Sequence, residues 1–235
     1  MLLIIRKLGE YASRLAGPGS LTAMDVVVAG GHGKVALRLL KLLADRGDRA
    51  RGLIRNPDHA GDLEAAGAEA VVCDLEREDD VAPFVEGADA VVFAAGAGPG
   101  SGAARKQTMD LGGALKLIDA ARANGIDRYV IVSSVGAGQP ERASGPMRPY
   151  IEAKAEADRA LGASGLAYTI VRPGGLTDDR GGGRVRVGVD IGYGRVTRDD
   201  VAATLLAVLR ADNTIGKTFE LLEGDTPIEE AVRSL

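Results

Sequence analysis

The fold of this chain is decided by residues 24–36, which read MDVVVAGGHGKVA. The run at 24–29 is short, apolar and rich in β-branched valine, as expected for a strand buried on both faces of a parallel sheet. A glycine-rich turn follows at residues 30–33, and apolar residues at helical spacing from Val35 to Asp45 predict a helix that ends at Gly47. The domain therefore opens with a strand, a tight turn and a helix.

Strand and helix patterns keep alternating along the rest of the chain. Further strands are expected at residues 49–54, 68–73, 88–94, 128–133 and 167–171, and helices at 57–66, 108–123 and 149–162. Strands separated by helices predict an α/β fold, a doubly wound parallel sheet of the Rossmann type. After Gly175 the pattern loosens into a strand at 184–189, a helix at 199–210 capped by Thr197 or Asp199, and a strand at 217–222.

Composition limits the classes of protein to which the chain can belong. Its 235 residues suit one α/β domain, and 46% of them are hydrophobic. A net charge of −4 gives no electrostatic reason to expect nucleic-acid binding. The single cysteine, Cys73, excludes a disulfide within the chain and is interpreted as a packed thiol because it ends an apolar run. No cysteine–histidine cluster has the spacing of a metal site.

The first 23 residues precede the expected first strand. Residues 1–5 are apolar and Arg6 and Lys7 follow them, which is the reverse of the order in a secretory signal. The chain has no stretch of ~20 apolar residues that could span a bilayer. We expect residues 1–23 to be a dispensable extension, with an amphipathic helix packed on the domain or a partner as the alternative. The protein is expected to be cytoplasmic, with a single domain over residues 24–235.

The glycine-rich turn has the composition of a phosphate-binding loop. A phosphate needs free backbone N–H groups at a helix N-terminus and no side chain in its way. Gly30 permits a tight turn, Gly33 lets the backbone approach a pyrophosphate, and Ala36 allows the helix to pack closely on the strand. His32 is interpreted as a loop residue facing the ligand rather than as a catalytic base. We expect a dinucleotide pyrophosphate to be bound by Gly30, Gly31, His32, Gly33, Lys34 and Val35.

The ends of the next three strands supply the rest of the expected cofactor site. Arg55 follows the second strand, where an acidic residue selects NAD and a cation can neutralise the 2′-phosphate of NADP. We therefore expect NADP(H), with NAD as the alternative if Arg55 is only a solvated surface residue. Asp74, beside Leu75, can accept a hydrogen bond from the adenine amino group or cap the next turn. The small residues Ala94, Ala95 and Gly96 suit a backbone wall against the cofactor.

With these features in place, the chain resembles the atypical short-chain dehydrogenases/reductases, near the NmrA-like and biliverdin/flavin-reductase-like NAD(P)-binding proteins. The resemblance covers residues 24 to about 222. It rests on the segments GGHG at 30–33, DL at 74–75, SS at 133–134, YIEAK at 150–154 and RPGGL at 172–176. It implies the Rossmann fold and an NAD(P)-dependent oxidoreductase activity.

The resemblance also implies a catalytic set. In the family a tyrosine exchanges the substrate proton, a lysine stabilises the tyrosinate and binds the nicotinamide ribose, and a serine bonds the reacting oxygen. The matching residues are Tyr150, Lys154 and Ser134. The spacing of Tyr150 and Lys154 places both on one helical face. Ser133 is expected to point elsewhere because side chains alternate along a strand.

Two further segments complete the expected site. The backbone of Pro173, Gly174 and Gly175 is expected to pass along the nicotinamide, and Asp178 to Gly183 suits a mobile flap over the substrate or a simple crossover. One position departs from the family pattern. Many relatives have an asparagine that supports a proton relay in the helix after the fourth strand, and the matching residue here is Asp110.

The sequence therefore predicts an NADP(H)-dependent oxidoreductase that acts on a small carbonyl, alcohol or conjugated substrate. The substrate region would be minimal and lie mainly in residues 174–235. A nucleotide-sugar epimerase or dehydratase is one alternative, although so short a region leaves little room for a sugar nucleotide. A non-catalytic NAD(P)-binding redox sensor is the other, because of Asp110. The expected partner is a small-molecule substrate, with monomer and dimer both open.

Overall fold

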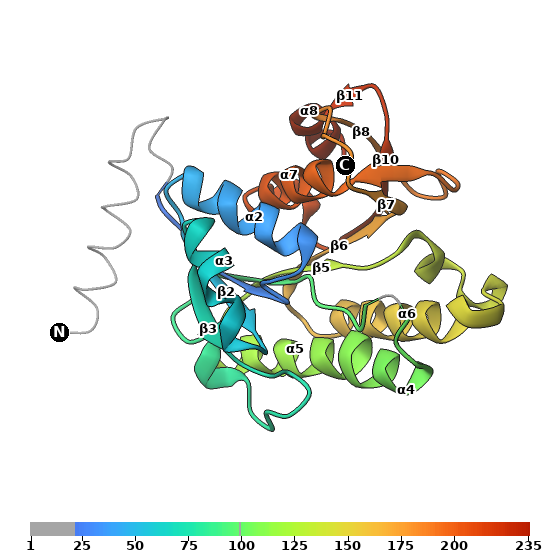
Figure 1. The fold of residues 1–235 in the computed structure, drawn as a ribbon. Coiled ribbons are helices and arrows are strands. Elements are labelled where there is room, and N and C mark those ends of the chain that lie inside the picture. The colour runs from blue at the N-terminus through green and yellow to red at the C-terminus, as the bar shows by residue number, and fades with distance from the viewer. Residues whose placement is uncertain (1–21, 99) are drawn as a thin grey trace.

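The structure is a computed structural model that describes residues 22–98 and 100–235 (Figure 1). Residues 1–21, which hold most of the expected N-terminal extension, lie outside the described residues. The strands of the main sheet are β1 (Asp25–Ala29), β2 (Arg49–Ile54), β3 (Glu69–Val72), β4 (Ala90–Phe93), β5 (Arg128–Val132), β6 (Ala167–Pro173), β8 (Arg184–Gly188), β10 (Lys217–Glu223) and β11 (Thr226–Pro227). A second, two-stranded sheet joins β7 (Gly175–Thr177) to β9 (Arg195–Thr197).

Helices connect these strands. The α-helices are α2 (Lys34–Asp45), α3 (Ala60–Ala65), α4 (Ala103–Arg105), α5 (Ala114–Ala123), α6 (Arg148–Gly162), α7 (Arg198–Leu209) and α8 (Ile228–Arg233). The short 3₁₀ turns are η1 (Pro57–His59), η2 (Ala82–Phe84), η4 (Val135–Gly138), η5 (Pro140–Arg142), η6 (Gly145–Met147) and η7 (Asp212–Thr214), and η3 (Lys106–Gly113) is a π-helix.

The strand order confirms the doubly wound Rossmann fold. Among the described residues the main sheet runs β11-β8-β10-β6-β5-β4-β1-β2-β3. Strands β1 to β6 and β10 are parallel, whereas β8 pairs antiparallel with both β10 and β11. From β1 the chain proceeds to β2 and β3 on one side and, after the crossover, to β4, β5 and β6 on the other. The strand order therefore reverses between β1 and β4, where such sheets bind ligands.

Burial of β1 on both faces explains its uninterrupted valine run. Val26 and Val28 pack with α2 and α7 on one side of the sheet, and Val27 and Ala29 pack in the core that includes α5 and α6 on the other. Figure 1 shows α2, α7 and α8 on one face of the sheet and α5 and α6 on the opposite face. Side chains of a strand alternate between its faces, so a strand covered on both sides is apolar throughout.

The helix after β4 differs from its predicted form. A single α-helix was expected at 108–123, but the helical stretch already begins at Ala103 and takes the wider π-helical form over η3 before it continues as α5. The spacing of the apolar residues did not predict this change, because a short π-helical stretch with i→i+5 hydrogen bonds has almost the same apolar pattern as an α-helix. The wider turn carries Asp110, whose side chain is fully buried.

The C-terminal region is small and packs onto the same sheet. Helix α7 contacts α2, and its N-cap is Thr197, whose side chain accepts a hydrogen bond from the Asp200 backbone N–H at 3.0 Å. This confirms one of the two predicted caps. The strand expected at residues 217–222 is β10, and its parallel pairing with β6 makes it the seventh parallel strand of the sheet. None of the described helices combines the length and the apolar character that crossing a membrane would need.

Candidate cofactor and active site

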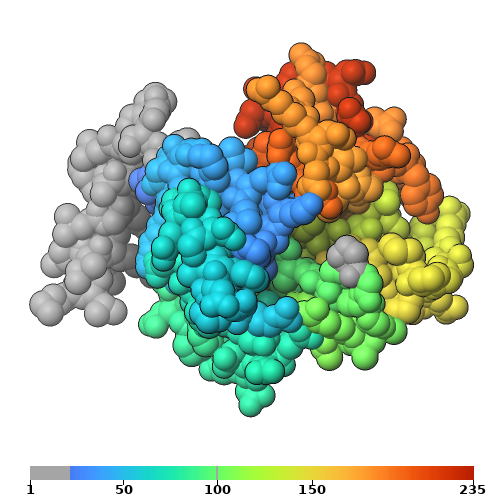
Figure 2. Space-filling view, in the orientation of Figure 1, coloured from blue at the N-terminus to red at the C-terminus, as the bar shows by residue number. Residues whose placement is uncertain are grey.

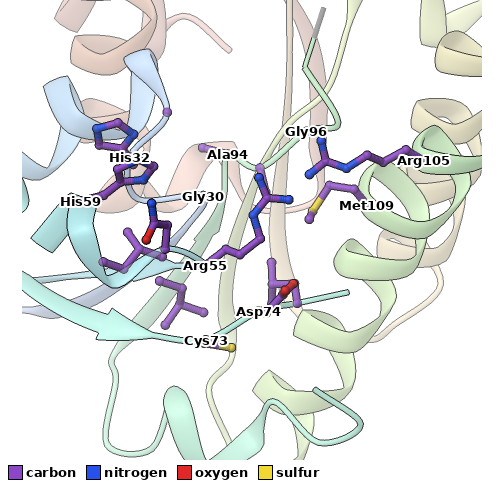
Figure 3. A pocket seen from close by; sticks show the side chains of 16 residues that line it. Gly30, His32, Arg55, His59, Cys73, Asp74, Ala94, Gly96, Arg105 and Met109 are labelled. Atoms are coloured by element: carbon purple, nitrogen blue, oxygen red, sulfur yellow. The ribbon is translucent and has the colours of Figure 1, made fainter. Parts of the chain in front are cut away.

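A pocket of about 250 Å³ lies at the reversal point of the strand order (Figure 3). Its walls come from the end of β2 and from the residues that follow β1, β2, β3 and β4, together with His59 of η1 and two residues of the helical stretch after β4. They are Gly30, His32, Gly33, Leu53, Ile54, Arg55, Asn56, His59, Cys73, Asp74, Leu75, Ala94, Ala95, Gly96, Arg105 and Met109. The carboxyl ends of four parallel strands therefore converge on one cavity.

The glycine-rich turn has the shape that the sequence predicted. Gly30 has a φ of +81°, which L side chains rarely adopt, and a Cβ there would lie 2.6 Å from Ala95 Cα. Only glycine therefore lets the β1 turn meet the end of β4 this closely. Gly33 is the extended N-cap residue of α2, with a φ of −66° and a ψ of 147°. Its exposed backbone leaves the helix N-terminus open to a ligand.

Some backbone N–H groups of the glycine-rich turn form hydrogen bonds within the fold, and those that follow are available to a ligand. Gly31 N–H donates to Leu53 O at 2.8 Å, and Gly33 N–H donates to Gly30 O at 2.7 Å. These two bonds hold the turn in place. Helix α2 begins at Lys34, and the first N–H groups of a helix have no acceptor within it. The donors that can face a phosphate are therefore those of the first turn of α2, including Lys34 and Val35, rather than that of Gly31.

Two arginines, Arg55 and Arg105, point into the pocket (Figure 3). Arg55 Nη1 lies 3.7 Å from Glu76 Oε2, and Arg105 donates to the same oxygen at 3.1 and 3.2 Å. Burial raises the pKa of Glu76, but hydrogen bonds from Thr108 and Arg105 and the charges of Arg105 and Arg55 outweigh it, so this pKa lies below its usual range. Glu76 is therefore a stable anion that keeps both guanidinium groups beside the pocket.

Asp74 caps the turn after β3, which is one of the two roles that the sequence left open. Its Oδ1 accepts a hydrogen bond from Glu76 N–H at 3.0 Å, which caps the turn after β3. The side chain also lines the pocket, where its second oxygen lies 3.7 Å from Arg77 Nε. A carboxylate in this place can accept a hydrogen bond from an exocyclic amine.

The chain has two histidines, and both lie at the pocket wall (Figure 3). The rings of His32 and His59 stack with centroids 3.6 Å apart, and His32 Nε2 lies 2.7 Å from Asp62 Oδ2. The stacked pair joins the glycine-rich turn to η1. The prediction that His32 is a wall residue facing the ligand is consistent with this placement.

Cys73 also lines the pocket but is buried and unreactive. Burial, with the charges of Glu78 and Asp74, raises the pKa of its thiol to about 12. The thiol is therefore protonated at neutral pH, when a reactive cysteine would need to be a thiolate. This supports the interpretation of Cys73 as a packing residue.

Tyr150 and Lys154 lie on α6, beyond the pocket and next to η3. Lys154 is buried, and its Nζ donates to Val132 O at 3.1 Å and lies 3.4 Å from Asp110 Oδ1. The same ammonium group lies 5.9 Å from the centroid of the Tyr150 ring, as the spacing on one helical face predicted. The other oxygen of Asp110 accepts a hydrogen bond from Ala97 N–H at 3.1 Å. A buried carboxylate–ammonium pair therefore supports the half-buried tyrosine.

Asp110 also joins this pair to the pocket. A Cβ added to Gly96, a pocket residue, would lie 3.1 Å from Asp110 Oδ1. Met109, the neighbour of Asp110 on η3, lines the same pocket. The pocket at the ends of β1 to β4 and the Tyr150–Lys154 pair are therefore adjacent parts of one continuous edge of the sheet.

The two serines after β5 have different surroundings. Ser133 is buried and its Oγ donates to Asp158 Oδ2 at 2.9 Å, so it points away, as predicted. Ser134 is half-buried and begins η4, whose Gly136 packs closely on Ile151 of α6. Ser134 thus lies on the segment that contacts the first turns of α6.

A second buried ion pair holds the base of α6. Arg172 Nε donates to Asp158 Oδ2 at 2.9 Å, the oxygen that Ser133 also bonds. Burial raises the pKa of Asp158, although the Arg172 charge and the Ser133 bond oppose the rise. The sequence did not predict this cluster, which fixes the end of β6 against α6.

The segment from Pro173 to Gly175 is packed more tightly than expected. Gly174 N–H donates to Leu221 O at 3.1 Å and Gly175 N–H donates to Gly194 O at 2.9 Å, while proline has no N–H to offer. These donors are therefore used within the fold. Any contact of Pro173, Gly174 or Gly175 with a nicotinamide carboxamide would have to use their carbonyl oxygens.

The expected flap at residues 178–183 is anchored at both ends. The backbone N–H groups of Gly181, Gly182 and Gly183 donate to the carboxylates of Asp199 and Asp200 on α7. Asp178 lies 2.5 Å from Lys34 Nζ and 3.0 Å from Arg198 Nη1. These bonds join the C-terminal region to the start of α2, and Figure 2 shows the two parts meeting at the surface. They favour the crossover over the mobile flap.

The structure brings together only part of the predicted site. The pocket holds Gly30, His32, Gly33, Arg55, Asp74, Leu75, Ala94, Ala95 and Gly96, whereas Gly31, Lys34, Val35, Ser134, Tyr150, Lys154, Pro173, Gly174 and Gly175 are not among its lining residues. Seven lining residues were not predicted as part of the site: Leu53, Ile54, Asn56, His59, Cys73, Arg105 and Met109. The signal available for Arg105 and Met109 was their i, i+4 spacing after β4, which by itself does not show which face meets the cavity.

Comparison with known proteins shows the family to which this chain belongs. A family model described as NAD(P)H-binding matches residues 30–212. The "uncharacterized sugar epimerase YhfK" of Bacillus subtilis (strain 168) is 42% identical over 214 residues, which cover 90% of this chain and 100% of that protein.

Solved structures show the same likeness. A "putative NAD-dependent epimerase/dehydratase" from Bacillus halodurans has a TM-score of 0.87 at 42% identity, covering 91% of this chain and 100% of that one. ChuY, an "anaerobillin reductase" from Escherichia coli O157:H7, has a TM-score of 0.70 at 26% identity, covering 86% and 98%. The chain therefore belongs to the NAD(P)H-binding family of atypical short-chain dehydrogenase/reductase-like proteins.

Proposed function

We propose that this chain is an NADP(H)-dependent oxidoreductase that reduces or oxidises a small carbonyl, alcohol or conjugated substrate. The observation that carries the proposal is the placement of Tyr150 beside a buried lysine, next to a dinucleotide pocket that contains two arginines. The pocket supports binding of the cofactor, and the tyrosine–lysine pair supports proton transfer. The "anaerobillin reductase" likeness supports reduction as the chemistry.

The residues of the pocket fit NADP. Asp74 can accept a hydrogen bond from the adenine amino group, and the apolar walls Leu75 and Met109 can hold the base. The guanidinium groups of Arg55 and Arg105 can bind the 2′-phosphate. Gly33 is exposed and is the N-cap of α2, so the pyrophosphate can reach the start of this helix. When bound, the nicotinamide supplies or takes the hydride.

The remaining steps belong to the protein's own side chains. Tyr150 gives a proton to the substrate oxygen during reduction, or takes it during oxidation. Lys154 stabilises the tyrosinate and is held in place by Val132 O and Asp110. Ser134, at the end of β5, donates a hydrogen bond to the same substrate oxygen. The proposed catalytic residues are therefore Tyr150, Lys154 and Ser134.

Turnover of NADPH tests this proposal. The purified protein is incubated with NADPH and a panel of quinones, flavins, aldehydes and linear tetrapyrroles, and oxidation is followed by the loss of NADPH absorbance. We expect at least one acceptor to support sustained turnover. Saturable NADPH binding without turnover across the panel would contradict the proposal and favour a redox sensor.

Replacing Arg55 by alanine is expected to weaken NADPH binding by about 10- to 100-fold and NADH binding by less than about threefold. The charge-assisted hydrogen bonds of an arginine to a phosphate are lost only with the cofactor that carries the 2′-phosphate. Titration calorimetry with each cofactor measures both affinities. Arg122→Ala, at an exposed position on α5, is the matched control. An equal loss for NADPH and NADH would contradict the NADP preference.

An epimerase or dehydratase is the second candidate, and the descriptions of the Bacillus subtilis and Bacillus halodurans relatives favour it. Such an enzyme returns the hydride to its own substrate, so it retains its cofactor and consumes none. Mass spectrometry of the cofactor released on denaturation separates the two proposals. A stoichiometric NAD that survives gel filtration supports the epimerase, whereas a protein purified without cofactor that then consumes NADPH supports the oxidoreductase.

A further inference from the structure

Lys106, the first residue of η3, places a second ammonium group at the ring of Tyr150. Its Nζ lies 5.3 Å from the centroid of that ring, and Lys154 Nζ lies 5.9 Å from the same centroid. Both distances lie within the range of cation–π attraction. The two lysines reach the tyrosine from different elements, Lys106 from η3 and Lys154 from α6.

The charge of Lys154 is already countered. Asp110 has no exposed surface, and its Oδ1 lies 3.4 Å from Lys154 Nζ. Ala97 N–H donates to one oxygen of this carboxylate, and the Lys154 ammonium group forms an ion pair with the other oxygen, which accepts no hydrogen bond. The pair carries no net charge, so the field that Lys154 exerts on Tyr150 is much reduced.

The charge of Lys106 is not countered in this way. Its Nζ donates to Gly98 O at 2.9 Å, which is a neutral acceptor. Within residues 22–98 and 100–235, no carboxylate forms an ion pair with it. The side chain is half-buried, so water screens it only in part.

We propose that Lys106 is a positioning residue that supplies the net positive charge favouring the tyrosinate form of Tyr150. Asp110 offsets much of the field of Lys154, and the charge of Lys106 adds to the stabilisation of the tyrosinate that Lys154 provides. This inference rests on the proposed function, since it acts through Tyr150. It assigns a role to a residue that belongs to neither the pocket nor the predicted catalytic set.

The other charged groups near Tyr150 are accounted for. On α6, Arg148 and Glu152 form an exposed ion pair, with Arg148 Nε donating to Glu152 Oε1 at 2.7 Å. Of the elements that pack on α6, η3 contributes Lys106 and Asp110, and η5 contributes the exposed Glu141 and Arg142, which are adjacent and opposite in charge. Helix α5 contributes Lys116, which donates to the carbonyl oxygens of Leu75 and Glu78, together with Asp119 and Arg122. Asp158, deeper on α6, pairs with Arg172. Of the two lysines placed over the Tyr150 ring, Lys106 is thus the one that lacks a carboxylate partner among the described residues.

An ultraviolet difference titration tests the inference without a substrate. The tyrosinate absorbance of the protein minus that of Tyr150→Phe reports the titration of Tyr150 alone. In Lys106→Met the midpoint of this titration is expected at a pH higher by about half to one unit, a three- to tenfold fall in the tyrosinate-to-tyrosine ratio at a given pH. Lys106→Arg, which keeps the charge, should restore most of the shift. Lys41→Met, an exposed lysine paired with Asp45 on α2, is the control.

A double variant separates charge from structure. Asp110→Asn removes the charge that neutralises Lys154, so the Tyr150 midpoint should fall, and Lys106→Met should then shift it less than in the wild-type background. Circular dichroism checks that each variant is folded, and if Asp110→Asn does not fold, the Lys106→Met and Lys106→Arg titrations still decide the question. An unchanged midpoint in Lys106→Met would overturn the inference.

Turnover distinguishes failure of this inference from failure of the proposed function. With an acceptor from the panel, Tyr150 must be protonated to act as the acid, so Lys106→Met should move the alkaline limb of the kcat/KM profile to higher pH by the amount seen in the titration, and Lys106→Arg should not. Full turnover in Tyr150→Phe would contradict the proposed function, although the titration would still report the charge at Tyr150. Loss of turnover in Tyr150→Phe with an unmoved profile in Lys106→Met would contradict only the role of Lys106.

Discussion

Replacing Tyr150 by phenylalanine is expected to lower kcat/KM for NADPH-dependent turnover by about 10²- to 10⁴-fold, the range that general acid–base catalysis contributes. The substitution removes only the phenol oxygen, so the packing of the half-buried ring against η3 is kept. Lys154 also keeps its contacts with Val132 O and Asp110. NADPH affinity should therefore change by less than about twofold.

Steady-state kinetics and calorimetry on the same preparation measure the two quantities. Tyr168→Phe is the matched control, since Tyr168 lies near the start of β6, at the opposite edge of the sheet from the site. Its turnover should equal that of the wild type. Retention of more than about a tenth of the activity in Tyr150→Phe would contradict the assignment of Tyr150 as the acid and base.

The second large effect is on stability. Replacing Lys154 by methionine is expected to lower the free energy of unfolding by about 3–5 kcal/mol, because it leaves Asp110 as a buried carboxylate without its cation. Methionine fills most of the volume of the lysine stem, so lost packing contributes little. Urea unfolding followed by circular dichroism gives the free energy.

The partner variant decides between a charge effect and a packing effect. In Lys154→Met/Asp110→Leu the orphaned charge is removed as well, and apolar replacements of a buried ion pair are often neutral in stability. The double variant should therefore recover most of the loss, although it would remain inactive. A double variant as unstable as the sum of its two single variants would show that Asp110 and Lys154 are not energetically coupled.

The sequence predicted the first strand, the glycine-rich turn and the first helix, because each of these depends on a pattern of neighbouring residues. Each of three local patterns favours one backbone structure: the valine run favours the strand β1, the glycines favour the tight turn, and the amphipathic pattern favours the helix α2. Together these elements place Gly30 against Ala95. The strand ends that carry Arg55 and Asp74 then follow, because parallel strands bring their carboxyl ends to one edge. This is why half of the predicted cofactor residues line a single pocket.

The features that the sequence did not predict depend on contacts between segments that lie far apart in the chain. The ion pair of Lys154 with Asp110 joins α6 to a π-helical turn, and no periodic pattern distinguishes that turn from an α-helix. The donors of Gly174 and Gly175 are used by Leu221 and Gly194, partners that only the folded C-terminal region supplies. In the same way, Asp199 and Asp200 anchor the glycines at 181–183, so a stretch that looked mobile from its composition is tied to α7.

A crystal structure of the protein with NADP⁺ would show whether the pocket and Tyr150 form one active site, through the position of the nicotinamide C4 relative to the Tyr150 hydroxyl. We expect adenine beside Asp74, the 2′-phosphate between Arg55 and Arg105, and the pyrophosphate at the first turn of α2. We also expect C4 to face Tyr150 with room for one carbonyl group between them. A nicotinamide ring that turns C4 away from Tyr150, or a 2′-phosphate that contacts neither arginine, would contradict this arrangement.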